Sequence, residues 1–510
     1  MIPTTPDRRS LVAGSETHHP RTYGNFRKPR TSGLRGLSLG ATMLLFAGLV
    51  AVVLATLISI WVALTLAVGL GLLTVPLAVK DRHGRTLMQR GAVRLAWWRT
   101  TSSGGHLYRS GPLGRSGHGR CRLPGLAAES LLTEAQDGYG RPFAVITIPA
   151  TGHHTAVISC DADGAALVDE QQVDTWVAHW GQWLSTLGSE PDLVAASVTV
   201  ETAPDSGVRL QHEIHANAVP DAPPLAGAML REVLSAYPAG SAQIATRIAL
   251  TYSGAARPGA PRRSIEDMAL HIGTRLPGLT AGLAMTGAGT AVPMTATELA
   301  EAVRVAYDPT VASLVEEARA TGGTGLTWDQ AGPMAAQETW GQYRHDGAFS
   351  ITWAMTEAPQ GEVFSNVLTG LVQPNRDIAR KRVTLLYRPH TRAEGARVVQ
   401  QDYKNALFNA QQSQIGQARD DAEVAAARRT TEEQAQGHGV IRFGLLITAT
   451  VSSADELAKA AATVDNLAPA ARIAVRPVYG SQAAAFAAAL PLGLVLPLHT
   501  ALPQTVRDAM

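Results

Sequence analysis

The residues that most resemble a catalytic motif are His212, Glu213 and His215, which form an HExH sequence. In the helical zinc motif the two histidines are four residues apart, so both imidazoles lie on one face of the helix. Here they are three residues apart, and the segment VRLQHEIHA (208–216) alternates like a β-strand, which would point the two imidazoles to opposite faces of a sheet. We therefore expect a structural role for this segment and no zinc site.

A second group of potential metal ligands comprises His153, His154, Cys160, Asp161 and Asp163. Adjacent histidines in a strand diverge, and no CxxC or HxxxH spacing brings two of these ligands onto one metal ion. The sequence therefore predicts neither a metal ion nor a cofactor.

The remaining polar motifs do not assemble a reaction centre either. The tetrapeptide YRHD (343–346) is reminiscent of a phosphohydrolase, but no second His/Asp cluster accompanies it, so we expect structural use. The phosphate-binding pattern GxxxxGK[ST] is absent from the sequence, which excludes ATP hydrolysis through that loop. A GxSxG pattern at 36–40 opens an apolar segment instead of joining a strand to a helix. Four carboxylates whose spacing does not pair them as acid and base are expected at the surface: Glu170, Asp174, Asp192 and Glu201. The sequence favours a protein that is not an enzyme.

Three tryptophans, Trp176, Trp180 and Trp183, follow the spacing i, i+4, i+7 within a predicted helix, Glu170–Leu187. At this spacing they line one face of the helix. Such a stripe packs against a core in most proteins, and large aromatic side chains also anchor partner proteins. Both interpretations stay open, and the three tryptophans are the candidate partner-docking residues.

Composition bounds the class of protein. The 510 residues exceed one ordinary core, so several domains are expected, and 45% hydrophobic with 17% charged residues is a balance that folds. The net charge is +2 and no long Lys/Arg run lies outside the flanks of the apolar segment, so direct DNA binding is not indicated. Cys121 and Cys160 are too few for a disulfide framework, which agrees with a reducing compartment.

The longest apolar run predicts a membrane segment. Residues 37–79 contain no Asp, Glu, Lys or Arg, and these 43 residues are about twice what one crossing needs. Two crossings with a turn near Ser59–Trp61 fit better, and the basic flanks would hold both termini in the cytoplasm. We expect a multi-pass protein of the cell (cytoplasmic) membrane with the lipid bilayer as a partner. The alternatives are a single span with a re-entrant second segment, and a cleaved signal peptide, for which the run is too long.

Beyond the hairpin the periodicity predicts an α+β fold. Strands are expected at 142–149, 154–160, 194–202, 208–216, 243–253, 347–357 and 381–389, with helices at 170–187 and 224–235. Thr295 with Glu298, and Ser453 with Glu456, have the spacing of a capping box. Residues 391–436 should form one long helix, or two with a break near Gly416.

These patterns divide the chain into seven segments. They are a basic cytoplasmic N-terminal segment (1–36), a two-helix transmembrane hairpin (37–79), a basic linker (80–125), a first cytoplasmic α+β domain (126–256), a second cytoplasmic α+β region (264–390), a long helical segment (391–436) and a C-terminal β-α-β-α unit (437–510).

Several long stretches together resemble one family. They are PRTYGNFRKPR, KDRHGRTLMQR, HLYRSGPLG, LVDEQQVDTWVAHWGQWL, EAVRVAYDP, YRHDGAFSITWAM, ARKRVTLLYRPH and VYGSQAAAFAAALPLG. In this order the chain resembles an actinobacterial family of integral membrane proteins encoded with integrative conjugative elements and their type IV secretion-like machinery. The hairpin resembles the PrgI-type two-span subunits, and the α+β region, long helix and FAAALPLG resemble the N-terminal domain of the conjugative secretion ATPase.

The resemblance implies a structural or docking role. In the ATPase the corresponding stretch is followed by a motor domain with a phosphate loop, and that pattern is absent here. The resemblance thus implies a non-enzymatic inner-membrane component of a conjugative DNA-transfer apparatus. Its partners would be other secretion or conjugation subunits, an ATPase supplied in trans, and further copies of the same chain as a homo-oligomer. The alternative is a core membrane component of a type VII-like secretion system.

Overall fold

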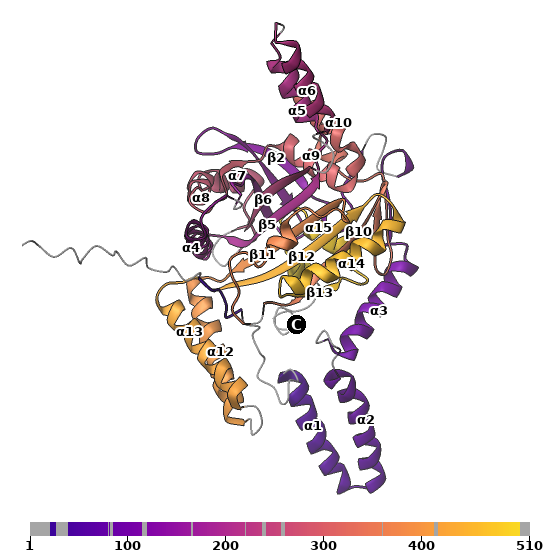
Figure 1. Ribbon diagram of the computed structural model, residues 1–510. Helices are drawn as coiled ribbons and strands as arrows, with labels where there is room; N and C mark the ends of the chain where they lie inside the picture. Colours follow the sequence, from indigo (N-terminus) through magenta and orange to yellow (C-terminus); the bar gives the residue numbers. More distant parts are fainter. Residues whose placement is uncertain are drawn as a thin grey trace, which may run out of the picture.

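One large antiparallel sheet forms the centre of the protein (Figure 1). The computed structural model describes residues 21–26, 39–79, 81, 85–114, 120–164, 167–219, 221–236, 241–256, 261–359, 361–412 and 417–499. The 13 strands have the order β1-β8-β9-β10-β12-β11-β5-β6-β4-β3-β2, while β13 also pairs with β10 and β7 with β4. Their bounds are β1 Leu107–Arg109, β2 Leu131–Gln136, β3 Pro142–Ile148, β4 His153–Asp161, β5 Leu193–Pro204, β6 Ala242–Ser253, β7 Thr290–Pro293, β8 Ala335–Glu338, β9 Tyr343–His345, β10 Ala348–Glu357, β11 Arg380–Pro389, β12 Ile441–Val451 and β13 Ala474–Pro477.

The sheet runs without interruption through several of the segments that the sequence suggested. The long strand β5 pairs with β6 on one side and with β11 on the other, and β11 pairs in turn with β12. Strands from 126–256, 264–390 and 437–510 therefore share one sheet. The segment 80–125, expected as a linker, contributes β1, which pairs with β8. The division into separate domains stays a prediction.

Helices cover both faces of the sheet, because alternate strand residues are apolar on both sides. On the first face, Trp183 and Met268 belong to an apolar core with residues of β3, β4 and β6, and Val383 belongs to a second core with α14. On the second face, Leu299 and Phe486 belong to a third core with β3, β4 and β12. The covering helices are α4 Glu170–Leu187, α7 Ile265–Gly273, α8 Leu276–Leu283, α9 Ala296–Tyr307, α11 Thr369–Val372, α14 Ala454–Ala470 and α15 Gln482–Ala488.

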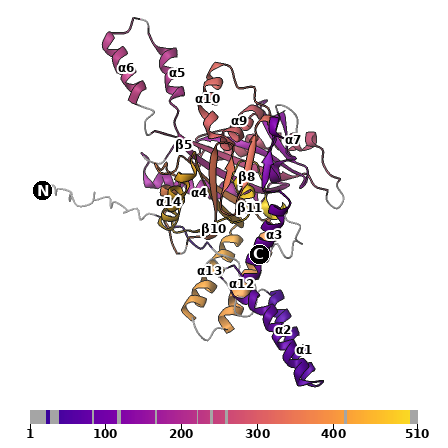
Figure 2. The ribbon, with the colours of Figure 1, turned by 90° about the vertical axis from the view of Figure 1, so that its right-hand side faces the viewer.

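Three helical pairs project from this body. α5 (Val208–Asn217) and α6 (Pro224–Ala236) extend from one side, where α5 contacts α10 (Ala312–Thr321). The pair α12 (Arg392–Gln412) and α13 (Gln417–Ala435), and the pair α1 (Leu39–Thr56) and α2 (Ile60–Ala78), extend from the opposite side (Figures 1 and 2). The helix α3 (Leu87–Ser102) connects α2 to β1.

The predicted transmembrane hairpin is corrected by the structure. The apolar run does form two packed helices, and Ser59 caps the second, with its hydroxyl accepting a hydrogen bond from the Trp61 amide at 3.3 Å. The charge-free run is divided into two helices of 18 and 19 residues. Among the described residues no helix has the length and apolar character to cross a membrane. The transmembrane part of the predicted fold class, and the multi-pass membrane localisation, are therefore wrong.

Other local predictions have mixed outcomes. The capping box of Thr295 and Glu298 is present at the start of α9, whereas the Ser453 hydroxyl accepts from the Asp455 amide and forms no reciprocal box with Glu456. The helical segment 391–436 forms two helices, α12 and α13; the predicted break near Gly416 lies outside the described residues.

Candidate functional site

The HExH segment is helical, and the strand prediction for 208–216 is wrong. His212 and His215 lie on α5, both exposed, and the Nδ1 atom of His215 is 2.6 Å from the carbonyl oxygen of Gln211. Leu210 and Ile214 have helical i, i+4 spacing as well as strand alternation, and the packing of α5 on α10 and α6 selects the helix. No group of three or more His, Cys, Asp or Glu side chains suited to a metal ion occurs within the described ranges.

The histidines of β4 are buried and neutral. Burial lowers the pKa of both His153 and His154 to about 4. His154 Nδ1 lies 3.0 Å from the Thr147 hydroxyl. Burial also raises the pKa of the Cys160 thiol to about 12, so this cysteine is not a thiolate nucleophile near neutral pH. These residues form the interior of the sheet.

His345 of the YRHD tetrapeptide is a fully buried structural residue. Its Nδ1 lies 2.5 Å from the Tyr307 carbonyl oxygen, so this nitrogen carries the proton and donates. Nε2, 2.8 Å from the Ser350 Oγ, then accepts from the serine hydroxyl. Burial lowers the pKa of His345 to about 4, which preserves this neutral arrangement. A histidine with both nitrogens engaged has no free position for a substrate.

The three tryptophans of α4 lie between that helix and the rest of the body. Trp183 is buried and donates from Nε1 to the Leu279 carbonyl oxygen at 3.1 Å. Trp180 stacks on it with ring centroids 5.0 Å apart and meets the edge of Tyr387 on β11. Trp176 is half-buried against Gly287. The structure therefore uses the stripe chiefly for packing, and only part of Trp176 and Trp180 faces outward.

A row of hydroxyl-bearing side chains crosses the second face of the sheet. Each pair lies directly opposite in neighbouring strands and is within hydrogen-bonding distance, from 2.7 to 3.2 Å between oxygens. We call these residues the hydroxyl row; they are Ser350 with Thr450, Thr352 with Thr448, Thr199 with Thr384, and Thr155 with Thr251.

The segment 482–495 covers the hydroxyl row, and we call it the strap. Thr384 donates to the Ala489 carbonyl oxygen at 2.8 Å, and Thr251 donates to the Gly493 carbonyl oxygen at 3.2 Å. Gln482 accepts from the Thr352 amide through Oε1 at 2.8 Å and donates to its carbonyl oxygen through Nε2 at 3.2 Å. The strap thus supplies partners to polar groups that would otherwise be buried without them.

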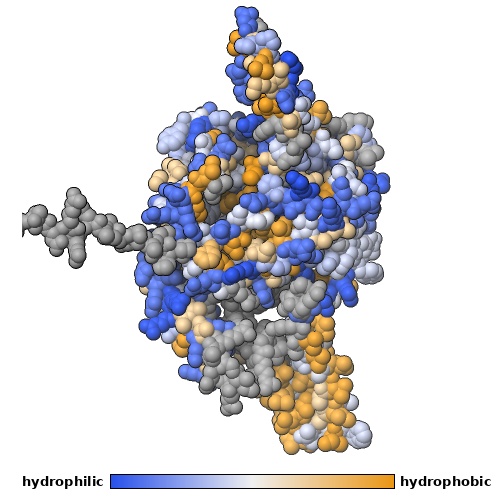
Figure 3. Space-filling view, in the orientation of Figure 1, coloured by the Kyte–Doolittle hydropathy of each residue, from blue (hydrophilic) through white to orange (hydrophobic). Residues whose placement is uncertain are grey.

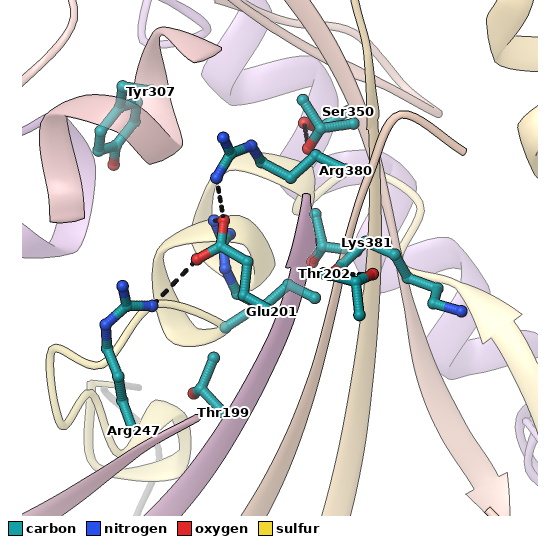
Figure 4. Close-up of polar contacts among 12 residues, drawn as sticks. Thr199, Glu201, Thr202, Arg247, Tyr307, Ser350, Arg380 and Lys381 are labelled. Carbon is teal, nitrogen blue, oxygen red and sulfur yellow. Dashed lines mark hydrogen bonds and ion pairs between the residues drawn. The ribbon is translucent and has the colours of Figure 1, made fainter. Parts of the chain in front are cut away.

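One buried carboxylate, two residues along β5 from Thr199 of the hydroxyl row, accepts hydrogen bonds from three arginines. Glu201 of β5 accepts from Arg247 of β6 at 3.1 Å, and from Arg380 and Arg382 of β11 at 2.8 and 3.1 Å. In Figure 4, Arg247 and Arg380 reach the carboxylate from opposite sides, while Lys381 points away, as strand alternation requires. The side chain of Arg382 is only 2% exposed, and its guanidinium lies 5.5 Å from the ring centre of Phe486 in the strap. We call Glu201 with these three arginines the arginine cluster.

The arginine cluster carries an excess of positive charge. Burial acts to raise the pKa of Glu201, but the charges of Arg382, Arg380 and Arg247 outweigh it and hold this pKa well below its usual value. Burial lowers the pKa of Arg247, and the Glu201 carboxylate offsets part of that effect. The carboxylate is therefore ionised, and chemically the cluster can hold an anion.

The expectation that the acidic residues lie at the surface is wrong for three of them. Glu201, Asp174 and the Asp192 carboxylate are buried. Asp174 accepts from the Tyr23 hydroxyl at 2.8 Å, and Asp192 pairs with Arg263 at 2.8 Å. The strand VAASVTVET alternates polar with apolar residues, a pattern typical of a strand with one face in water, so the sequence gives no signal that Glu201 is buried.

The helix α6 carries an exposed apolar face. Leu225, Met229 and Val233 follow the spacing i, i+4, i+8 and are exposed by 72%, 59% and 45%. Leu230, one position from Met229, widens this face. We call these four side chains the α6 face. Figure 3 shows hydrophobic side chains on this projection and on the α1–α2 hairpin at the opposite end. Exposed apolar patches of this kind mark interaction surfaces in proteins.

Comparison with known families covers a small part of the chain. Residues 30–89, which include α1, α2 and the start of α3, match a family described as Domain of unknown function (DUF8461). None of the curated proteins matches the chain. The description of the matching family gives no activity, and the resemblance to the conjugative-element family stays a prediction.

Proposed function

We propose that this protein is a non-enzymatic docking component of a conjugative DNA-transfer apparatus related to type IV secretion machinery, and that it recruits an ATPase carried by another chain. The observation that carries the proposal is the α6 face, which projects from the body and exposes Leu225, Met229 and Val233.

The way the pair α5–α6 is attached supports a docking role. The N-terminal end of α5 is attached to the body, because the Ser206 hydroxyl just before it donates to Glu316 of α10 and α5 packs on that helix. A firmly attached pair loses little conformational freedom on binding, so less of the binding free energy is spent on ordering it. An amphipathic helix of this kind can also lay its apolar face into a hydrophobic groove of a partner protein.

The side chains of the sheet that could react are enclosed. His153, His154 and Cys160 are buried and neutral, and Trp183 of α4 is buried as well. The sequence lacks GxxxxGK[ST], so the energy for transfer would come from a partner that has such a loop. The kind of apparatus is inferred from the eight stretches that resemble conjugative-element proteins.

The test is a pull-down of the tagged full-length protein from its native host with mass spectrometry of the retained proteins. Recovery of a conjugation-type ATPase is the expected result. Met229→Asp places a charge in the α6 face and should abolish that recovery, because the partner's apolar surface would then have to bury an unpaired carboxylate. The matched control is Ser235→Asp, at an exposed position of the same helix outside this face.

Two outcomes would reject the proposal. Recovery of type VII core subunits without any conjugation subunit would assign the chain to the other kind of secretion system. Equal recovery of the ATPase by Met229→Asp and by the unmodified protein would show that the α6 face is not the docking surface.

A further inference from the structure

The arginine cluster is not electrically balanced. Three guanidinium groups surround one carboxylate, which leaves an excess of two positive charges in a largely buried place. Nearby, Glu301 is paired with Arg319 and also accepts from the Thr324 hydroxyl at 2.5 Å, so it is already engaged. Burying unbalanced charge is costly, so a compensating group is expected.

Hydrogen-bond donors in the cluster are also left over. Nε and Nη1 of Arg382 and Nε of Arg380 are buried and have no hydrogen-bond partner among the described residues. Guanidinium N–H groups are strong donors that native structures rarely leave unpaired. Arg382 is fixed in place by its contact with Glu201 and by Phe486, so these donors are already oriented.

We propose that the arginine cluster binds a phosphate group, held by Arg247, Arg380 and Arg382 beside Glu201. A phosphate with a charge near −2 would neutralise the excess charge, whereas a carboxylate would neutralise half of it. The tetrahedral phosphate has enough oxygens to accept from several guanidinium groups at once, and arginine is the residue best suited to such multidentate contacts.

Two arginines of the cluster are partly exposed. The side chains of Arg380 and Arg247 are 12% and 15% exposed, and Arg319, close enough to Arg247 to affect its pKa, is 46% exposed. Arg319 belongs to α10, on which α5 packs. In this proposal the phosphate approaches from the side on which these three arginines are exposed. The proposal is independent of the docking role, because it involves no residue of the α6 face.

The first test measures binding to the purified full-length protein by isothermal titration calorimetry in chloride buffers of matched ionic strength. The probes are inorganic phosphate and a nucleoside triphosphate. Saturable binding of either probe is expected; higher affinity for the triphosphate would identify a nucleotide as the source, and equal or weaker affinity would identify free phosphate. Absence of saturable binding for both probes would overturn the proposal.

Variants separate binding from a purely structural role. Arg380→Gln should weaken phosphate binding about tenfold or more, because a charged hydrogen bond is lost. Glu201→Gln should tighten it, because the competing carboxylate charge is removed, even though the unliganded protein becomes less stable. Arg428→Gln, on the exposed surface of α13, is the control and should leave binding unchanged.

A structural role alone predicts a different pattern. In that case both variants of the cluster would lower the melting temperature, and added phosphate would raise it no more than chloride does. If Glu201→Gln does not fold, the measurements on the unmodified protein and on Arg380→Gln still decide, because unchanged phosphate affinity in Arg380→Gln would overturn the proposal.

Discussion

Replacement of Glu201 by Gln tests how much the central carboxylate stabilises the sheet. Three guanidinium groups lie 2.8–3.1 Å from its oxygens. At about 4 Å between charge centres and an effective dielectric constant of about 20, each attraction is worth about 4 kcal/mol. Loss of hydration on burial offsets most of this sum, and removal of one partner from a buried ion pair costs about 3–5 kcal/mol in practice. We expect Glu201→Gln to lower the free energy of unfolding by about 3–5 kcal/mol.

The assay is urea unfolding followed by tryptophan fluorescence at pH 7 in phosphate-free buffer. The midpoint should fall while the dependence on urea concentration stays the same, since the surface exposed on unfolding is unchanged. Glu432→Gln is the matched control, because the pair of Glu432 with Arg428 is exposed and worth less than about 1 kcal/mol. A loss below about 1 kcal/mol for Glu201→Gln would refute the view that this carboxylate holds three strands together.

Three further perturbations test other parts of the fold. His345 and the two histidines of β4 have pKa values of about 4 when folded and about 6.5 when unfolded, so the unfolded state binds more protons between these values. The free energy of unfolding should therefore fall on acidification from pH 7 to 5, by up to about 2 kcal/mol per histidine. In His345→Gln this fall should be smaller. A midpoint of unfolding that does not depend on pH would contradict this reasoning. Trp183→Ala should cost about 3–5 kcal/mol in urea unfolding, with exposed Trp98→Ala as the near-neutral control, and equal losses would contradict the packing role. Gly493→Ala places a methyl group 2.1 Å from a hydroxyl oxygen of the hydroxyl row at a φ of +68° and should reduce folded yield in size-exclusion chromatography, unlike Gly91→Ala in open space on α3.

Periodicity and caps predicted much of the local structure. The helix 170–187 coincides with α4, and the strand 243–253 with β6, because each has a long and unambiguous apolar pattern. The segment 208–216 was ambiguous, since its apolar residues fit both periods, and contacts with α10 and α6 decided for the helix. The charge-free run gave a helical hairpin with the expected turn, but sequence alone overestimated what its two helices could span.

The arginine cluster could not be predicted from any single segment of the sequence. Glu201 was one of four carboxylates expected at the surface, since their spacing does not pair them as acid and base. It is buried because helices and the strap cover both faces, a property of the assembled sheet. Arg380 and Arg382 reach it through a strand pairing about 180 residues apart, and no local pattern predicts such a partner.

The strap also bears on when the protein can fold. Gly493 accepts from Thr251, 242 residues earlier, and Gln482 satisfies the backbone of Thr352, 130 residues earlier. Every described strand of the sheet is therefore synthesised before the strap that covers the hydroxyl groups of the sheet. Contacts so distant in sequence slow folding, because the chain must first close a long loop. Until the strap has been synthesised, the sheet presents a polar and only partly covered surface, and chaperones bind incompletely covered intermediates of this kind.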